Sequence, residues 1–107
     1  MSFEQGQAIE SPVSTLLADG MACRKPDPWA LQIIREHVAA IVSVSDREIA
    51  TAMKLIFLAT HQVAEGAGAA ALAAAMKAKQ NLQGLKIGLS LSGGNVDHDV
   101  YARVLME

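Results

Sequence analysis

Aromatic residues and cysteine are scarce in this chain. Aromatic residues make up 4% of the 107 residues, and Cys23 is the single cysteine. The hydrophobic core must therefore be built from alanine, valine, leucine, isoleucine and methionine, and the smaller of these side chains bury modest area. Because one cysteine allows no internal disulfide, the composition fits a reducing compartment, and we expect a cytoplasmic protein.

The chain also has no basic cluster and no long uninterrupted apolar run. Its formal net charge is −2, with no run of Lys or Arg, which disfavours nucleic-acid binding by phosphate neutralisation. The longest apolar stretch, residues 49–76, contains Lys54, His61 and Glu65. A membrane-spanning helix needs about 20 predominantly apolar residues. We therefore expect neither a nucleic-acid partner nor a membrane partner.

The sequence predicts where two helices begin. Asp27 can cap a helix whose first residue is Pro28, because proline suits the first helical position. Ser45 and Glu48 have the spacing of a capping box, which opens a helix predicted to run to about His61. Both starts are followed by apolar residues at helical spacing.

Two further segments are predicted to be strands and two to be helices. Ala40–Val44 and Lys86–Leu91 have the alternating or β-branched composition of short strands. Helices are expected over Ala69–Lys79 and from Val96 or Asp97 to Met106. Strands separated by helical crossovers predict an α/β fold with parallel pairing. Two strands are too few for an independent parallel sheet, so we expect a partial parallel sheet with flanking helices.

Three short stretches are candidate binding features, and each has a simpler alternative. Ser92 and Gly93 end the second predicted strand, where a hydroxyl and a close backbone approach could serve a ligand or merely form a turn. Glu65 lies in AEGAGA, where it is either part of a pocket wall or a carboxylate at a helix start. Gly20, in ADG, could be an ordinary turn glycine. His98 lies between two aspartates, but a solvated first helical turn is the simpler interpretation, and we predict no metal site.

Four stretches occur in an order that resembles a known family. They are LADGMACRKPDPWALQIIREHV, IVSVSDREIATAM, VAEGAGAAALAA and KIGLSLSGGNVD. Together they resemble the C-terminal portion of threonine/serine dehydratases, which are pyridoxal-phosphate enzymes of fold type II, and serine racemase is similar. The resemblance implies a fragment of that family's large domain. It divides the chain into a tail at residues 1–15 and a single α/β domain at residues 16–107.

The resemblance also assigns roles to the candidate residues. The serine at Ser92 would bond the pyridine nitrogen of the cofactor, backbone near Gly20 would line the ring, and Glu65 would lie on the pocket wall. Gly93 would let the chain turn away after the contact. A neutral hydroxyl leaves the pyridine nitrogen weakly activated, whereas a carboxylate would hold it protonated. The weaker activation favours prompt loss of a β-hydroxyl group from the substrate.

Other family features have no counterpart here. The Schiff-base lysine, the glycine-rich phosphate loop and the asparagine-bearing substrate loop belong to an upstream segment, so we assign no catalytic residue. We expect a truncated dehydratase that is inactive alone and does not hold pyridoxal phosphate by itself. Such a chain is expected to form a homo-oligomer or to meet a partner chain that supplies the missing part. The alternative is a binding subunit that complements a lysine-bearing partner. None of the five lysines lies in a matching context: Lys25, Lys54, Lys77, Lys79 and Lys86.

Overall fold

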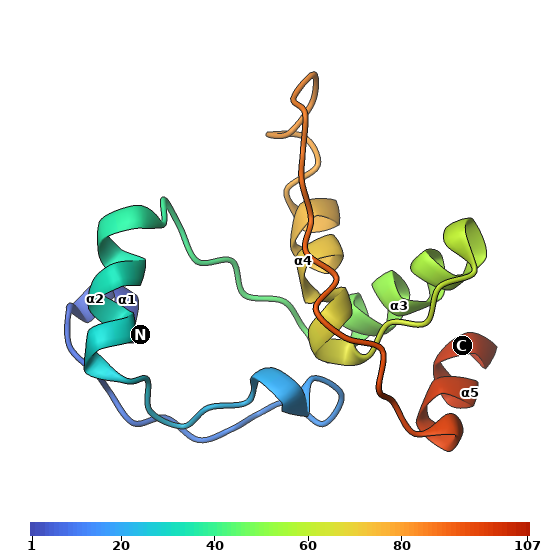
Figure 1. Ribbon diagram of the computed structural model, residues 1–107, viewed down its shortest axis with the longest axis horizontal. Helices are drawn as coiled ribbons and strands as arrows, with labels where there is room; N and C mark the ends of the chain where they lie inside the picture. Colours follow the sequence, from blue (N-terminus) through green and yellow to red (C-terminus); the bar gives the residue numbers. More distant parts are fainter. The chain divides into compact units, whose positions relative to one another are not determined.

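The computed structural model describes all 107 residues and contains helices but no strand (Figure 1). The chain divides into two compact units. The first consists of residues 1–14 and 22–43, and the second of residues 15–21 and 44–107. No helix in the chain combines the length and the apolar character that crossing a membrane would require.

The first unit contains α1 (Ser2–Gln5) and α2 (Pro28–His37). The predicted start of α2 is confirmed: the Asp27 carboxylate accepts hydrogen bonds from two backbone N–H groups of the first turn, both at 3.0 Å, and Pro28 is the first helical residue. Helix α1 lies in the predicted tail, where no element was expected. Little of this unit is buried: Leu31 is its one buried residue, and Trp29 is 73% exposed.

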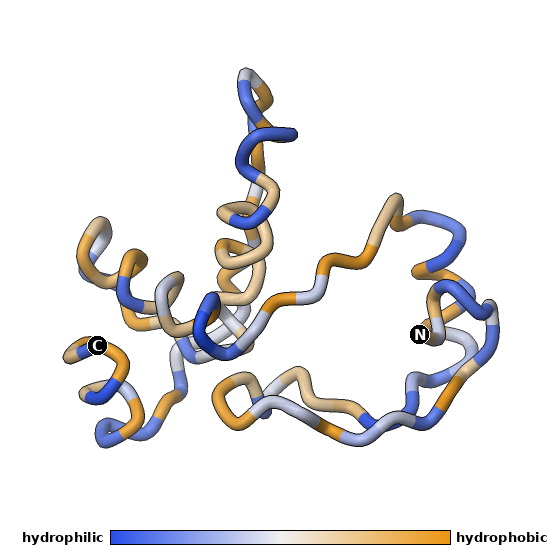
Figure 2. The backbone as a smooth tube through the Cα atoms, turned by 180° about the vertical axis from the view of Figure 1, so that it is seen from behind, coloured by the Kyte–Doolittle hydropathy of each residue, from blue (hydrophilic) through white to orange (hydrophobic).

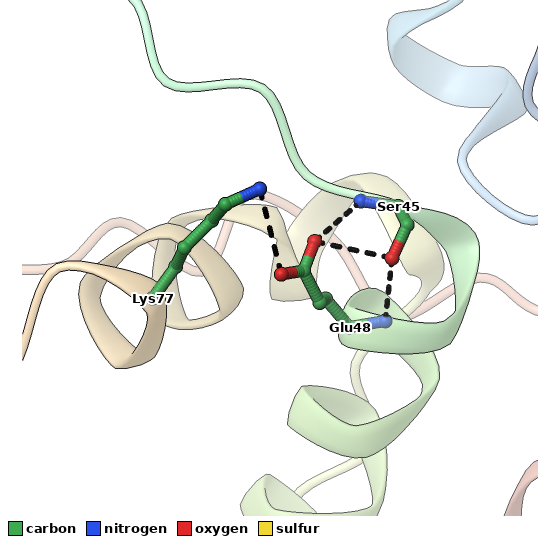
Figure 3. A network of polar contacts seen from close by, with 3 residues as sticks. All are labelled: Ser45, Glu48 and Lys77. Carbon is green, nitrogen blue, oxygen red and sulfur yellow. Dashed lines mark hydrogen bonds and ion pairs between the residues drawn. The ribbon is translucent and has the colours of Figure 1, made fainter.

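The second unit contains three longer helices, of which α3 (Asp46–Thr60) has the predicted capping box. The Glu48 N–H donates to Ser45 Oγ at 3.2 Å, and the Ser45 N–H donates to Glu48 Oε2 at 2.7 Å (Figure 3). The bond from the Ser45 N–H, together with a second from the Ser45 hydroxyl to the same Glu48 oxygen at 3.1 Å, lowers the pKa of the Glu48 carboxyl, and the Lys77 ammonium 3.5 Å from Glu48 Oε1 adds to the effect. The helix ends at His61, which adopts a left-handed conformation with φ of 59°.

Helices α4 (Gly66–Lys77) and α5 (His98–Met106) and the short 3-10 helix η1 (Asp19–Met21) complete this unit. Helix α4 begins three residues before the predicted Ala69, because Glu65 is the extended N-cap residue. It shows as a mostly pale orange, weakly hydrophobic helix in Figure 2. The last helix begins at His98, one or two residues after the predicted start at Val96 or Asp97, with Asp97 as N-cap, and it ends at the predicted Met106.

The core of the second unit lies between α3 and α4. Ile49 and Met53 are its largest fully buried side chains. Alanines make up most of the rest, so few large side chains separate the packed elements, as the aromatic-poor composition predicts. The other members of this core are Ala18, Ala52, Ala64, Ala69, Ala73 and Val104.

The two predicted strands are absent, and the partial parallel sheet predicted from them does not form. Residues 40–44 and 86–91 lie outside every helix but pair with no neighbouring strand. Composition favours an extended backbone, but a strand also requires a hydrogen-bonded partner. In Figure 1 the chain turns beyond α4 and returns as a long extended segment. Gly84, with φ of 76°, lies at this turn.

Candidate functional site

The loop that carries Gly20 is anchored to the first turn of α3. The Thr15 hydroxyl donates to one oxygen of the Asp46 carboxylate, and the Leu16 N–H donates to the other at 2.8 Å. The Thr15 bond is the main cause of a lowered pKa of the Asp46 carboxyl, with the Leu16 N–H second. Beyond this anchor, the Leu17 carbonyl oxygen lies so close to Gly66 that a Cβ there would collide with it. The loop is therefore fixed at both α3 and α4.

Gly20, Glu65 and Gly93 lie together at the start of α4, although they are far apart in the sequence. A Cβ on Gly93 would collide with Glu65 Oε1, and a Cβ on Gly20 would lie 3.9 Å from the same oxygen. The Glu65 N–H donates to the Gly93 carbonyl oxygen at 3.1 Å. Two of the four predicted site residues, Gly20 and Gly93, therefore lie against the carboxylate of a third, Glu65.

Ser92, the fourth predicted residue, directly precedes Gly93. Its side chain is exposed, as is Gly20, whereas Glu65 and Gly93 are partly buried. The Gly93 carbonyl oxygen accepts a hydrogen bond from the Glu65 N–H, which holds the backbone at Gly93 in place. The Ser92 hydroxyl belongs to the residue directly before it. The cluster therefore contains the Ser92 hydroxyl, the Glu65 carboxylate, and backbone at Gly20 and Gly93 that carries no side chain.

Two more glycines make this arrangement possible, and their role was not predicted. A Cβ on Gly68 would collide with the Gly93 carbonyl oxygen, and a Cβ on Gly94 would lie 2.5 Å from the Val63 carbonyl oxygen. Both contacts are with backbone atoms, which cannot rotate away. The glycine runs around residues 66–68 and 93–94 therefore let two backbone segments approach each other closely. The alternation of Gly and Ala in GAGA was the available signal for this packing.

The electrostatics of the cluster restrict what it can bind. Glu65 takes part in none of the ion pairs of the chain and makes no capping bond to α4. Its carboxylate can accept hydrogen bonds, and the Ser92 hydroxyl can both donate and accept. None of the four residues is cationic. The cluster therefore suits the ring and polar edge of a flat ligand, while a phosphate group would need donors from elsewhere.

Two lysines near this cluster in the sequence, Lys77 and Lys86, lie far from it because of the length of chain in between. Lys77 ends α4, whose twelve residues at about 1.5 Å each separate it from Glu65 by roughly 18 Å. Lys86 precedes Gly93 by seven residues of extended chain, or roughly 20 Å. Neither Nζ is placed to reach a ligand held at Ser92.

The cluster lies outside the clefts described in both units. One cleft of the second unit lies between the Leu16–Leu17 loop, the first turns of α3 and helix α5. Neither this cleft nor four others have any of the four predicted residues in their lining. No group of three or more His, Cys, Asp or Glu side chains is arranged to hold a metal ion.

Comparison with known proteins identifies the class. The family described as pyridoxal-phosphate dependent enzyme matches residues 1–93, and the chain belongs to this family. The chain is 34% identical over 104 residues to the L-threonine ammonia-lyase of Thermotoga maritima, covering 97% of this chain and 26% of that protein. It is 33% identical over 106 residues to the serine racemase of Schizosaccharomyces pombe, covering 99% of this chain and 33% of that protein.

Solved structures of two enzymes also match the chain. For a threonine deaminase the TM-score is 0.82 at 34% identity, covering 90% of this chain and 34% of that chain. For the serine racemase of Dictyostelium discoideum the TM-score is 0.77 at 30% identity, covering 90% of this chain and 31% of that chain. The backbone follows the course of these enzymes even though no hydrogen-bonded ladder forms. The resemblance to threonine/serine dehydratases and serine racemase is thereby confirmed. The chain spans about a quarter to a third of the length of these relatives.

Proposed function

We propose that this chain supplies the ring-facing wall of a pyridoxal-phosphate site in an ammonia-lyase that acts on threonine or serine. The observation that carries the proposal is the gathering of Gly20 and Gly93 at the Glu65 carboxylate, with Ser92 directly before Gly93 in the chain. Relatives named L-threonine ammonia-lyase and serine racemase support the reaction class.

Each residue has a physical role in this wall. The Ser92 hydroxyl bonds the pyridine nitrogen as a neutral partner, so the nitrogen is not forced into its protonated form. The Glu65 carboxylate accepts a hydrogen bond at the polar edge of the ring. Gly20 and Gly93 leave backbone surface free of side chains, against which a flat ring can lie. When bound, pyridoxal phosphate supplies the electron sink for loss of the β-hydroxyl group of an amino acid.

Alone, the chain is expected to have no ammonia-lyase activity. The covalent attachment of the cofactor needs a lysine at the wall, and Lys77 and Lys86 are each more than about 15 Å away along their elements. The cluster also offers no cationic side chain to a phosphate group. We therefore propose that this chain acts as the C-terminal segment of a dehydratase whose lysine and phosphate loop come from elsewhere.

A second candidate function is a non-catalytic subunit that complements a lysine-bearing partner chain. The observation that favours it is the exposure of Ser92 and Gly20, which leaves the wall open on the side where a partner would complete the pocket. Under this hypothesis the chain binds a partner of the same family in a specific complex and restores its activity.

Borohydride trapping separates a complete site from an incomplete one. The chain is incubated with pyridoxal phosphate, reduced, and analysed by intact mass and peptide mapping. We expect either no adduct or labelling scattered over exposed lysines. A stoichiometric adduct at one lysine, lost in Ser92→Ala but kept in the control Ser90→Ala, would contradict the incomplete site.

Complementation tests the proposed role of the wall directly. The chain is mixed with the lysine-bearing N-terminal two-thirds of a related dehydratase, and formation of a 2-oxo acid from L-threonine and L-serine is followed. We expect activity that Ser92→Ala lowers, while Ser90→Ala behaves like the unaltered chain. Activity that is equal in both variants would contradict the assignment of Ser92 to the cofactor ring.

A further inference from the structure

The loop that leads into η1 is bonded to α3 through one carboxylate and one hydroxyl. The Asp46 carboxylate accepts the Thr15 hydroxyl with one oxygen and the Leu16 N–H with the other. The Thr15 oxygen itself accepts the N–H groups of Leu17 and Ala18, at 3.3 Å and 3.0 Å. A hydroxyl has one donor and two acceptor sites, and all three are used here. Two side chains therefore hold three successive backbone N–H groups of this loop.

These bonds continue into the turn that carries Gly20. Ala18 is fully buried, and its carbonyl oxygen accepts the Met21 N–H at 3.1 Å, which closes the turn around Gly20. A Cβ on Gly20 would lie 3.2 Å from the Cβ of Ala67 and 3.9 Å from Glu65 Oε1. Because so little room separates this backbone from the start of α4, a shift of the loop changes where Gly20 lies relative to the Glu65 carboxylate.

The Gly93 side of the same cluster has a separate support. The Glu65 N–H donates to the Gly93 carbonyl oxygen at 3.1 Å, and the Gly93 backbone packs against Gly68. Neither contact involves the loop or Asp46. The Gly20 side of the cluster can therefore be loosened without releasing the side that carries Ser92.

We propose that Asp46 is a positioning residue of the cofactor wall: acting through Thr15, its carboxylate sets the place of the Gly20 backbone against which the ring lies. This inference rests on the function proposed above. The bonds of the Asp46 carboxylate go to the loop, so it acts on the cofactor through Gly20 and not by contact. A carboxylate suits this role because charge-assisted hydrogen bonds are stronger than neutral ones. A loop that is ordered before the cofactor arrives also lowers the entropic cost of binding.

Amide hydrogen exchange on the full chain, followed by NMR, tests the support without any cofactor. Thr15→Val removes the hydroxyl but keeps the shape of the side chain and leaves Asp46 in place. The Met21 amide should then exchange faster by about tenfold or more, because the loop opens locally. The Glu65 amide, on the other support, should keep its rate. The matched control is Thr51→Val, since the Thr51 hydroxyl bonds only a backbone carbonyl within α3 and both rates should stay unchanged.

Two further variants and three outcomes make this test decisive. Thr15→Ser keeps the hydroxyl and should restore slow exchange of the Met21 amide. Asp46→Asn keeps one acceptor oxygen and should give a milder acceleration, with circular dichroism as the check that the helices persist. A Met21 amide that is unprotected in the unaltered chain, or that exchanges at the same rate in Thr15→Val, overturns the proposal. Equal acceleration of the Met21 and Glu65 amides also overturns it, because the two sides would then share one support.

Activity in the complex with the lysine-bearing segment separates positioning from cofactor chemistry. Thr15→Val should raise the pyridoxal phosphate concentration that gives half-maximal activity by about tenfold, with little change at saturating cofactor. Ser92→Ala should lower activity even at saturating cofactor. If Ser92→Ala lowers activity but Thr15→Val leaves the cofactor dependence unaltered, the proposed function stands and the role of Asp46 is overturned. If Ser92→Ala has no effect, or no active complex forms, the proposed function is contradicted, and hydrogen exchange decides by itself whether Asp46 positions Gly20.

Discussion

Gly68 allows the extended segment to cross the start of α4, and we predict that Gly68→Ala destabilises the chain. The new Cβ would collide with the Gly93 carbonyl oxygen and lie 3.1 Å from the Gly93 nitrogen. These are backbone atoms, so the collision can be relieved only by moving the segment that carries Ser92. In an exposed helix the same substitution would normally stabilise, because alanine is the better helix former by up to about 1 kcal/mol.

The expected magnitude follows from these two opposing effects. Overpacking against a fixed neighbour costs about 1–3 kcal/mol. Because the new Cβ would collide with a backbone oxygen, the upper part of this range, about 2–3 kcal/mol, applies, and subtracting about 1 kcal/mol of helix propensity leaves a net loss of about 1–2 kcal/mol in the free energy of unfolding. For a domain near this size, each kcal/mol lowers the melting temperature by about 4–8 °C. We therefore expect a fall of roughly 5–15 °C.

Thermal unfolding followed by far-ultraviolet circular dichroism measures this change. The matched control is Gly88→Ala, which makes the same substitution where nothing lies within 4 Å of the new Cβ. Measured at one low protein concentration, the control should melt close to the unaltered chain. If Gly68→Ala melted at the same temperature as the unaltered chain or higher, the close approach of residue 93 to α4 would be refuted.

Three further predictions concern the second unit. Met53→Ala should lower the free energy of unfolding by about 2–5 kcal/mol, because it opens a cavity in the core. Leu58→Ala changes a side chain that is 60% exposed and should lower it by about 0.5 kcal/mol or less. Equal losses for the two variants in urea unfolding would contradict the placement of the core. Ser45→Ala should cost about 1 kcal/mol through loss of the N-cap of α3, and an unchanged denaturation midpoint would show that the capping box is not made. The lowered pKa of Asp46 means that its contribution to stability is complete above its ordinary pKa of 3.8 and is lost as the pH falls through the lowered value. Asp46→Asn should therefore flatten the acid side of the stability profile, and an unaltered profile would argue against the Thr15 anchor.

The helices could be predicted from the sequence because their signals are local. Ser45 and Glu48 are three residues apart, and Asp27 precedes Pro28, so each helix start is specified within one turn. The start of α4 was misplaced because Glu65 caps it through backbone conformation alone, without a side-chain hydrogen bond that could have identified it. Local information was therefore sufficient for α2 and α3, where a side chain makes the cap, and it also located α5, whose N-cap Asp97 makes no side-chain hydrogen bond, but it misplaced the start of α4.

The strands could not be predicted reliably because a strand depends on two segments. Ala40–Val44 and Lys86–Leu91 have suitable compositions, but their hydrogen bonds would have to come from neighbours that their own sequences do not specify. The alternation in the second segment still carries information. It correctly indicates an extended backbone, along which Leu85, Ile87, Leu89 and Leu91 form one exposed apolar face.

The candidate site is intermediate between the helices, which local signals predict, and the strands, which local signals do not predict. Gly20, Glu65, Ser92 and Gly93 are candidates from their local sequence, but only the family resemblance assigns them to a cofactor, because nothing local distinguishes a turn glycine from one that faces a ring. Their convergence depends on tertiary contacts through Gly68 and the Asp46 anchor. The same close backbone approach that packs residue 93 onto α4 also places Gly93, the residue after Ser92, against the Glu65 carboxylate. Glycine is thus required here first by packing, and the wall proposed to face the cofactor is a consequence of that packing. A substitution that moves the backbone at residue 93 should therefore disturb stability and cofactor contact together, whereas Ser92→Ala should disturb the contact alone.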